Sequence, residues 1–196
     1  DLADARLARA EQILSVEKAA AKGVKLVYLN TGKLDDPVAH MMELTGGKGY
    51  NDVFVYAPVK PVVEMGDKLL ARDGCLNFFA GPTNPAFSAE FNFYNVHYGS
   101  THIVGTSGGN TDDMREALRM MESGDINPAA MITHIGGMNT VVDTVLRLPE
   151  IKGGKKLIYT NKDMPLVAIS DFAELGKNDP FYADLAEICS RHNELW

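Results

Sequence analysis

The sequence contains the uninterrupted apolar run Asp52-Val-Phe-Val-Tyr-Ala-Pro58, which is typical of a strand covered on both faces of its sheet. Strands that alternate with helices predict a parallel α/β sheet, and this chain shows that alternation. We therefore expect the first half of the chain to form an α/β domain. Its other strand-like runs, separated by helical stretches, are Lys25–Asn30, Cys75–Gly81 and His102–Ser107.

The first predicted element of the chain is a helix rather than a strand. Asp1-Leu-Ala-Asp-Ala-Arg-Leu7 runs directly into a predicted helix, with no strand before it. A parallel sheet that binds a dinucleotide normally begins with a strand, a glycine-rich turn and a helix, and an acidic residue ends its second strand. Only that acidic residue and the helix after it are present. The sequence therefore predicts a nucleotide-binding domain over residues 1–108 whose first two strands are missing, followed by an α+β segment over residues 109–196.

Capping residues and prolines predict where the helices begin and end. Ser15 and Asp36 are predicted N-caps, and Pro61 opens a helix that stops near Asp73-Gly74. Asp171 with Glu174 predicts a capping box. The C-terminal segment is expected to add the strands Met131–Ile135, Lys156–Thr160 and Pro165–Ile169, with helices near Asn139–Arg147 and from Asp179-Pro180.

Composition limits the classes of function. The net charge of −7 makes DNA or RNA a poor default partner, and no run approaches the ~18 apolar residues of a membrane span. The N-terminus is acidic and helical, unlike a signal peptide. Cys75 and Cys189 lie far apart, which indicates a reducing, cytoplasmic setting. The five histidines include no i,i+4 pair, so we expect no metal site built from this chain.

Two segments allow a functional and an ordinary interpretation. Gly105-Thr-Ser-Gly-Gly-Asn110 lies between a strand and a helix, where helix N-termini attract phosphate. Asp112 and Asp113 already occupy that positive end, however, and favour an ordinary turn. Pro82–Ser100 is rich in Phe, Asn and Tyr, which can stack on bases, yet without basic residues a packed loop or an oligomer contact is favoured.

Asp1 is the sharpest candidate for a binding residue. A carboxylate at the end of the second strand of a dinucleotide-binding sheet accepts hydrogen bonds from the adenosine ribose and repels a 2′-phosphate, which favours NAD over NADP. The alternative is a plain surface aspartate. Arg6 has a similar ambiguity, between a guanidinium stacked on adenine and a solvated helix residue.

The segment Asp1–Ala10, in which Arg and Leu follow the first Asp after five residues, resembles the region behind the second Rossmann strand of the medium-chain dehydrogenase/reductase superfamily of zinc-type alcohol and polyol dehydrogenases. The resemblance continues, segment by segment in the same order, to about Thr160. Within the superfamily, the sequence shows closer similarity to the branch of sugar-phosphate reductases such as L-sorbose 1-phosphate reductase. The later matching segments are Asp52–Ala57, Gly74–Gly81, His102–Thr106, Met114–Gly124, Ile132-Thr-His134 and Gly154–Thr160.

This resemblance implies the C-terminal part of a zinc- and NAD(P)-dependent oxidoreductase, with NAD favoured and a truncated Rossmann-type sheet. It would transfer hydride between nicotinamide and an alcohol, polyol or sugar phosphate. The zinc ligands and the glycine-rich turn would lie outside this chain, so no catalytic or metal-binding residue is assigned and the chain alone is expected to be inactive. The alternative is a non-catalytic nucleotide-binding or assembly domain. The implied cofactor-binding residues are Asp1, Arg6, Ala57, Ala80, Gly81, Thr106 and Ser107.

The missing strands would leave a gap in the sheet. The family's strand order is 3-2-1-4-5-6, so removing strands 1 and 2 separates Lys25–Asn30 from Asp52–Pro58. Strand edges left without a neighbour are adhesive. We therefore expect association into a homo-oligomer, with the aromatic stretch Phe87–Tyr98 as a further contact, whereas direct pairing of the two strands is the alternative.

Overall fold

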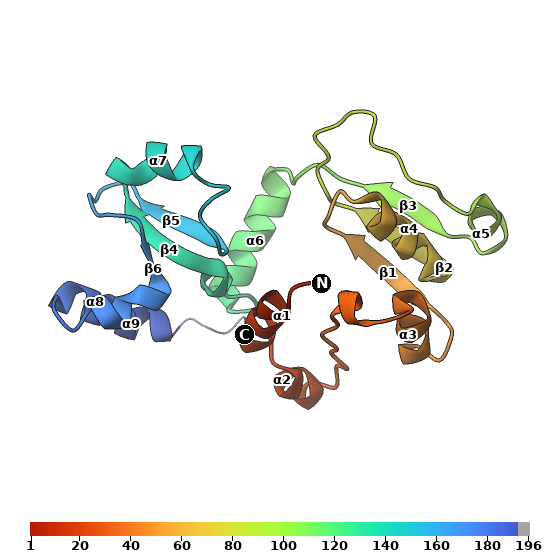
Figure 1. The fold of residues 1–196 in the computed structure, drawn as a ribbon, viewed down its shortest axis with the longest axis horizontal. Helices are drawn as coiled ribbons and strands as arrows, with labels where there is room; N and C mark the ends of the chain where they lie inside the picture. Colours follow the sequence, from red (N-terminus) through yellow and green to blue (C-terminus); the bar gives the residue numbers. More distant parts are fainter. Residues whose placement is uncertain (192–196) are drawn as a thin grey trace. The chain divides into compact units, whose positions relative to one another are not determined.

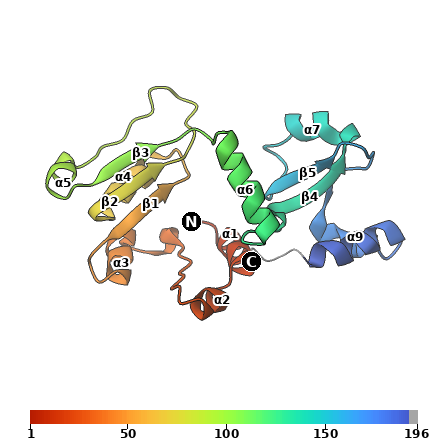
Figure 2. The ribbon, with the colours of Figure 1, turned by 180° about the vertical axis from the view of Figure 1, so that it is seen from behind.

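The computed structural model describes residues 1–191, which form two compact units (Figures 1 and 2). The first unit contains Asp1–Leu2 and Leu29–Met114, and the second contains Ala3–Tyr28 and the chain from Arg115 onward. The expected domain division into residues 1–108 and 109–196 stays a prediction.

The first unit is built on three parallel strands in the order β1-β2-β3, which confirms the α/β class. These strands overlap the three apolar runs expected around residues 52, 75 and 102. In chain order the elements are η1 (Thr31–Lys33), α3 (Pro37–Leu44), β1 (Tyr50–Val55), α4 (Lys60–Lys68), β2 (Leu70–Phe78), α5 (Phe93–Tyr98), β3 (His102–Gly105) and the start of α6 (Thr111–Ser123).

Two predictions about the strands of the parallel sheet and the helix next to them are wrong. The run Lys25–Asn30 does not form a strand and does not join the sheet of β1. The helix opened by Pro61 ends at Lys68, because the next segment begins β2 by pairing with Tyr50 of β1. This pairing is long-range, so local helix signals did not reveal it.

The end of the run Lys25–Asn30 nevertheless pairs with the start of the chain. The Asp1 backbone nitrogen donates to the Leu29 carbonyl oxygen at 3.1 Å, and the Thr31 N–H donates to the Asp1 carbonyl oxygen at 3.0 Å. Two such bonds on either side of Asn30 are the pattern of a parallel ladder. Within residues 1–191, this segment makes its contacts with Asp1 and Leu2, and no strand is formed there.

The core of the first unit lies between α4 and the sheet. Val55, Val63 and Leu76 form its buried cluster, and Leu76 has an exposed fraction of 0%. Gly66 lies one turn beyond Val63 on α4, and a Cβ at Gly66 would lie 2.8 Å from Cδ1 of Leu76. Glycine at this position therefore lets the helix approach the sheet closely.

The aromatic stretch Phe87–Tyr98 has a packed part and an exposed part. Phe87 stacks on Phe78 with ring centroids 5.9 Å apart, and Phe91 also packs against the core cluster. The following helix α5 leaves its phenylalanine and both of its tyrosines exposed. The packed-loop interpretation therefore describes the first part of the stretch.

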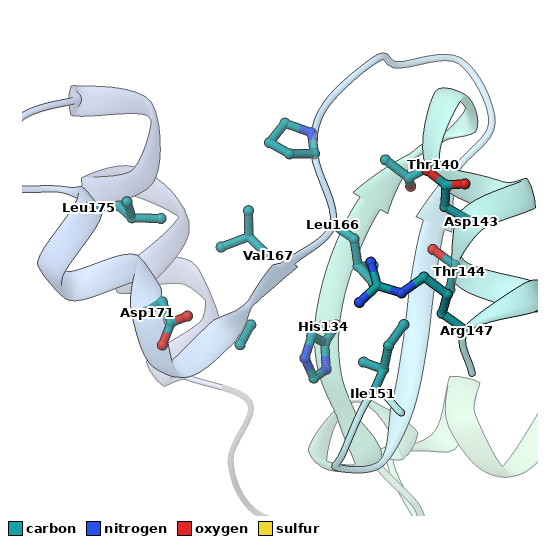
Figure 3. A pocket seen from close by; sticks show the side chains of 12 residues that line it. His134, Thr140, Asp143, Thr144, Arg147, Ile151, Leu166, Val167, Asp171 and Leu175 are labelled. Carbon is teal, nitrogen blue, oxygen red and sulfur yellow. The ribbon is translucent and has the colours of Figure 1, made fainter. Parts of the chain in front are cut away.

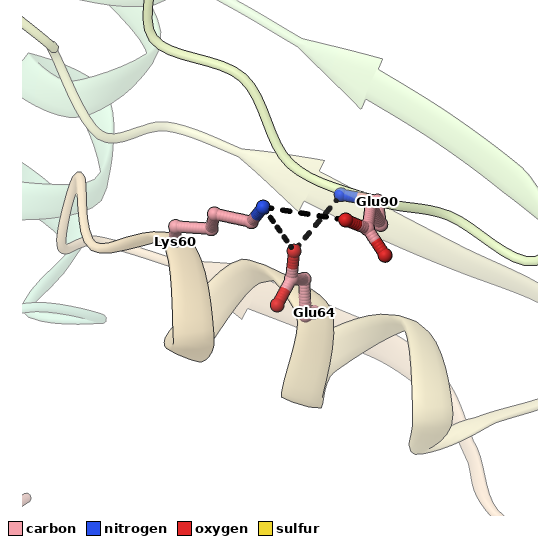
Figure 4. Close-up of polar contacts among 3 residues, drawn as sticks. All are labelled: Lys60, Glu64 and Glu90. Atoms are coloured by element: carbon pink, nitrogen blue, oxygen red, sulfur yellow. Dashed lines mark hydrogen bonds and ion pairs between the residues drawn. The ribbon is translucent and has the colours of Figure 1, made fainter.

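Polar contacts with α4 hold the same loop (Figure 4). The Glu90 N–H donates to Oε1 of Glu64 at 3.0 Å, and the Lys60 ammonium lies 3.4 Å from a carboxylate oxygen of each glutamate. The donated N–H lowers the pKa of Glu64. One turn further along α4, the Asn92 N–H donates to Asp67 at 3.0 Å. Backbone N–H groups of the loop thus bind side chains of α4 at two successive turns of that helix.

The second unit holds a mixed sheet in the order β5-β4-β6, in which β4 runs parallel to β5 and antiparallel to β6. This is the α+β character expected of the C-terminal segment. No helix within residues 1–191 is long and apolar enough to span a membrane. The elements are α1 (Asp4–Ile13), α2 (Val16–Ala21), the rest of α6, η2 (Pro128–Met131), β4 (Ile132–Gly137), η3 (Met138–Thr140), α7 (Val141–Leu146), β5 (Lys155–Tyr159), β6 (Val167–Ala168), η4 (Ile169–Asp171), α8 (Phe172–Leu175) and α9 (Pro180–Ser190).

The helix caps follow expectation with one exception. Ser15, Asp36 and Asp179 each accept a backbone N–H from the first turn of the helix that follows. The capping box predicted for Asp171 and Glu174 is wrong. The backbone of Asp171 is already helical, with φ −93° and ψ −11°, so its side chain makes no cap hydrogen bond.

Two side chains attach the N-terminal helix of the second unit. Nη2 of Arg9 donates to the Ala130 carbonyl oxygen of η2 at 3.1 Å. The Tyr28 hydroxyl lies 3.1 Å from the Ala10 carbonyl oxygen and 2.7 Å from that of Leu14. The Arg9 bond links residues 3–28 to the C-terminal elements with which they group, and the Tyr28 bonds hold the end of this segment against its own helix.

Gly66→Ala should destabilise the protein even though alanine is the better helix former. The added methyl would overlap the buried Leu76 side chain, and overpacking of this kind costs about 1–3 kcal/mol. Gly81→Ala is the matched control, because a Cβ there would meet no atom within 4 Å. Urea unfolding of the two variants measures the difference. Equal stability of both variants would contradict the close approach of α4 to the sheet.

Candidate functional site

The carboxyl ends of β1, β2 and β3 form one edge of the parallel sheet. Val55 pairs with Phe78, and Phe78 pairs with Gly105, so these residues form a row across the strands. In open α/β sheets, ligands bind beyond this edge. The role of the candidate residues in binding a cofactor stays a prediction, but the structure brings them to the same edge, within three residues after the row: Ala57, Ala80, Gly81, Thr106 and Ser107.

Small residues leave room at this edge. Ala80 is buried, and its N–H donates to the last carbonyl oxygen of β1 at 3.0 Å, which fixes the chain as it leaves β2. Gly81 is exposed, and a Cβ there would meet no atom within 4 Å. Ala57 is half-buried, whereas Thr106 and Ser107 are exposed. The small residues alternate with two exposed rings at this edge, because Tyr56 follows Val55 and Phe79 follows Phe78, and the centroids of these rings lie 5.8 Å apart.

The polar groups of the turn between β3 and α6 form hydrogen bonds with one another. The Thr106 hydroxyl donates to the Gly108 carbonyl oxygen at 3.1 Å. Oδ1 of Asn110 accepts the N–H groups of Asp112 and Asp113, and Asp113 in turn accepts the Asn110 N–H at 2.7 Å. Because these donors at the start of α6 already have acceptors, the geometry agrees with the ordinary-turn interpretation rather than with a phosphate site.

The other two candidate residues belong to different units. Asp1 lies in the first unit, where its backbone forms hydrogen bonds with Leu29 and Thr31. Arg6 lies in α1 of the second unit and lines a cavity there. Their roles toward adenosine stay predictions.

The sheet edge is open enough for a nicotinamide ring, and its role in holding one stays a prediction. The open space beside Gly81 and the neighbouring hydroxyls suit a planar group that carries an amide. In residues 1–191, no group of three or more His, Cys, Asp or Glu side chains could hold a metal ion. His192, one of the five histidines considered above, lies outside the described residues. A zinc-dependent step therefore cannot be derived from the described side chains.

A cavity of about 620 Å³ lies in the second unit, lined by residues of α7 and by the chain that leads into α8 (Figure 3). Its polar lining includes His134 of β4, Asp143 of α7 and Asp171 of η4, with Arg147 directly after α7. The Thr144 hydroxyl is buried and has no hydrogen-bond partner in the described part of the chain. Sequence reasoning missed this cavity because its residues share no motif and meet only in the fold.

His134 is shared by this cavity and by an adjoining one. Burial lowers its pKa, the Lys156 ammonium lowers the pKa further, and the Asp171 carboxylate acts in the opposite direction. Nδ1 of His134 lies 2.9 Å from Oγ1 of Thr133. The ring is therefore neutral near pH 7 and offers hydrogen bonds rather than a charge.

A family model described as zinc-binding dehydrogenase matches residues 5–123 of the chain. Over all 196 residues the chain is 52% identical to mannitol-1-phosphate 5-dehydrogenase of Aliivibrio fischeri, of which it covers 46%. Over 156 residues, 80% of the chain, it is 48% identical to L-sorbose 1-phosphate reductase of Klebsiella pneumoniae, of which it covers 36%. The chain thus spans less than half the length of these curated relatives.

A solved structure shares the fold. The crystal structure of benzyl alcohol dehydrogenase from Acinetobacter calcoaceticus matches with a TM-score of 0.61 at 20% identity, over 81% of this chain and 41% of that chain. The parallel order β1-β2-β3, the family model and the two relatives agree with one another. The chain belongs to the zinc-binding dehydrogenase family.

Proposed function

We propose that this chain is the C-terminal part of a zinc- and NAD(P)-dependent oxidoreductase that transfers hydride between nicotinamide and an alcohol, polyol or sugar phosphate. The observation that carries the proposal is the row Val55, Phe78 and Gly105, beyond which small residues share one sheet edge. The names of the two relatives, a mannitol-1-phosphate dehydrogenase and an L-sorbose 1-phosphate reductase, support a sugar phosphate as the substrate class.

The residues of this chain have binding and positioning roles in the proposal. The Asp1 carboxylate accepts hydrogen bonds from the adenosine ribose and favours NAD, and the Arg6 guanidinium stacks on the adenine. Backbone groups after β1, β2 and β3 hold the nicotinamide side and keep the ring oriented toward the substrate; these are the groups of Ala57, Ala80, Gly81, Thr106 and Ser107.

The remaining part of the protein supplies what this chain lacks. When bound, zinc would polarise the substrate oxygen, and its ligands lie outside the described residues in this proposal. The remaining part also supplies the strand that covers the outer edge of β1, whose neighbour in the described sheet is β2. Cytoplasmic location belongs to the proposal because Cys75 and Cys189 are both free thiols.

Association between copies is a further element of the proposal. A chain separated from the remaining part keeps the outer edge of β1 uncovered, and exposed strand edges pair with other strands. Homo-oligomerisation is therefore the state that we expect of the isolated chain.

Asp1→Ala in the complete enzyme should weaken NAD binding and reduce the discrimination against NADP. Loss of a charge-assisted hydrogen bond costs about 1.5–3 kcal/mol, which corresponds to roughly 10- to 150-fold in affinity. Asp4→Ala, which removes an equal charge three residues further on, is the matched control. The dissociation constants of both cofactors measure the effect. An unchanged NAD/NADP preference in Asp1→Ala would contradict the role given to Asp1.

The isolated 196-residue chain should show no dehydrogenase activity, because its described residues hold neither a zinc ligand set nor a pyrophosphate-binding turn. Cofactor reduction with a panel of polyols and hexitol phosphates, with and without added zinc, measures this. The complete protein assayed in parallel is the positive control. Zinc-dependent turnover by the isolated chain would contradict the proposal that the zinc ligands lie in the remaining part of the protein. An inactive complete protein would favour the non-catalytic alternative.

A further inference from the structure

Two cavities of the second unit share a wall that carries positive charge. Their volumes are about 540 Å³ and about 800 Å³. Arg9, Thr133, Lys152 and Gly153 line both of them. The fold thus places a guanidinium, an ammonium and a hydroxyl group at the junction of two hollows, although these residues are distant in sequence.

The charged groups at this junction are all cationic. No Asp or Glu of residues 1–191 lines either cavity, and Arg6 adds a third cation to the larger one. The whole chain has 26 acidic and 19 basic residues, so its composition does not favour a cationic lining. Like charges around one cavity repel each other, and a bound anion removes that repulsion.

Arg9 is held in position and keeps donors available. Its Nη2 donates to the Ala130 carbonyl oxygen at 3.1 Å, which fixes the guanidinium against η2. A guanidinium has five N–H donors in a fork that matches phosphate geometry. Within the described residues, the other donors of Arg9 and the ammonium of Lys152 have no hydrogen-bond or ion-pair partner.

The turn after Lys152 is built to lie close to β4. Gly153 has φ +105°, and a Cβ there would lie 2.7 Å from Oγ1 of Thr133. At Gly154 a Cβ would overlap the Met131 carbonyl oxygen. Glycine at both positions therefore permits the close approach that sets Lys152 beside Thr133.

Apolar groups continue from the charged wall into the larger cavity. Ala10, Ile13, Leu14 and Met131 line it, and the Tyr28 hydroxyl is engaged with carbonyl oxygens of α1 and of the residue after it. A ligand with an anionic group at one end and a ring or carbon chain at the other end fits such a lining.

We propose that this wall, formed by Arg9, Lys152 and Thr133, binds the phosphate group of an organic phosphate whose body lies in the larger cavity. The inference shares Arg6, which lines the larger cavity, with the hydride-transfer proposal, but Arg9, Lys152 and Thr133 have no role in that proposal, so the two can fail separately. A sugar phosphate and an adenine nucleotide both carry this chemistry, and the experiment separates the two sources.

Titration of the chain with inorganic phosphate at constant ionic strength, followed by two-dimensional amide NMR, tests the site. The signals of Thr133 and Gly153 should shift saturably, and Lys152→Gln should raise the dissociation constant about tenfold. Arg9→Gln should act similarly; it also removes the bond to Ala130, so Lys152→Gln decides the result where Arg9→Gln does not fold. Lys177→Gln is the matched control, because Lys177 pairs with Glu174 and lines neither cavity.

Parallel titrations with a hexitol phosphate against the hexitol, and with ADP against adenosine, identify the source of the phosphate. At least one organic phosphate should bind more tightly than inorganic phosphate at the same signals, and the one that does so names the ligand class. The proposal is overturned by the absence of saturable shifts at Thr133 and Gly153, by an unchanged dissociation constant in Lys152→Gln, or by an equal loss in Lys177→Gln. Weaker binding of both organic phosphates than of inorganic phosphate overturns it as well.

Discussion

Backbone hydrogen bonding between parallel strands brings the candidate residues to one sheet edge. It also explains why the run Lys25–Asn30 forms no strand. β2 pairs with β1 on one side and with β3 on the other, so the strand ends after Val55, Phe78 and Gly105 share an edge. Lys25–Asn30 has the same apolar character, but its ladder reaches only the first residues of the chain. Sequence that favours a strand is not sufficient, because an unpaired strand leaves its N–H and C=O groups without partners.

The sequence predicted those parts of the fold that depend on local signals. Apolar runs located β1, β2 and β3, and Ser15 and Asp36 cap their helices as expected. The prediction from sequence was wrong where contacts between residues distant in the chain determine the secondary structure. The segment after Lys68 joins β2 because Tyr50 pairs with Leu70. The sequence of α4 contains no pattern that predicts this pairing.

The same distinction applies to the functional sites. The residues of the sheet edge were named from the resemblance, and their role in cofactor binding stays a prediction. Because the ends of parallel strands meet at one edge whatever the side chains are, their shared position could be expected. The cationic wall could not, since Arg9 and Lys152 meet only through the packing of α1 against η2 and through a close glycine turn. Gly153 permits a close approach to Thr133, and Gly154 permits one to the Met131 carbonyl oxygen, and these approaches are tertiary contacts.

The central claim is that this chain is the cofactor-binding C-terminal part of a larger dehydrogenase. The structure of the complete protein with a nicotinamide dinucleotide bound tests it most directly. The account predicts a strand before Asp1 that continues the parallel ladder with Asn30, and a nicotinamide ring in contact with Ala80–Gly81 and Thr106–Ser107. A ring more than one side-chain length from both segments, or a chain before Asp1 that leaves the ladder, would contradict it.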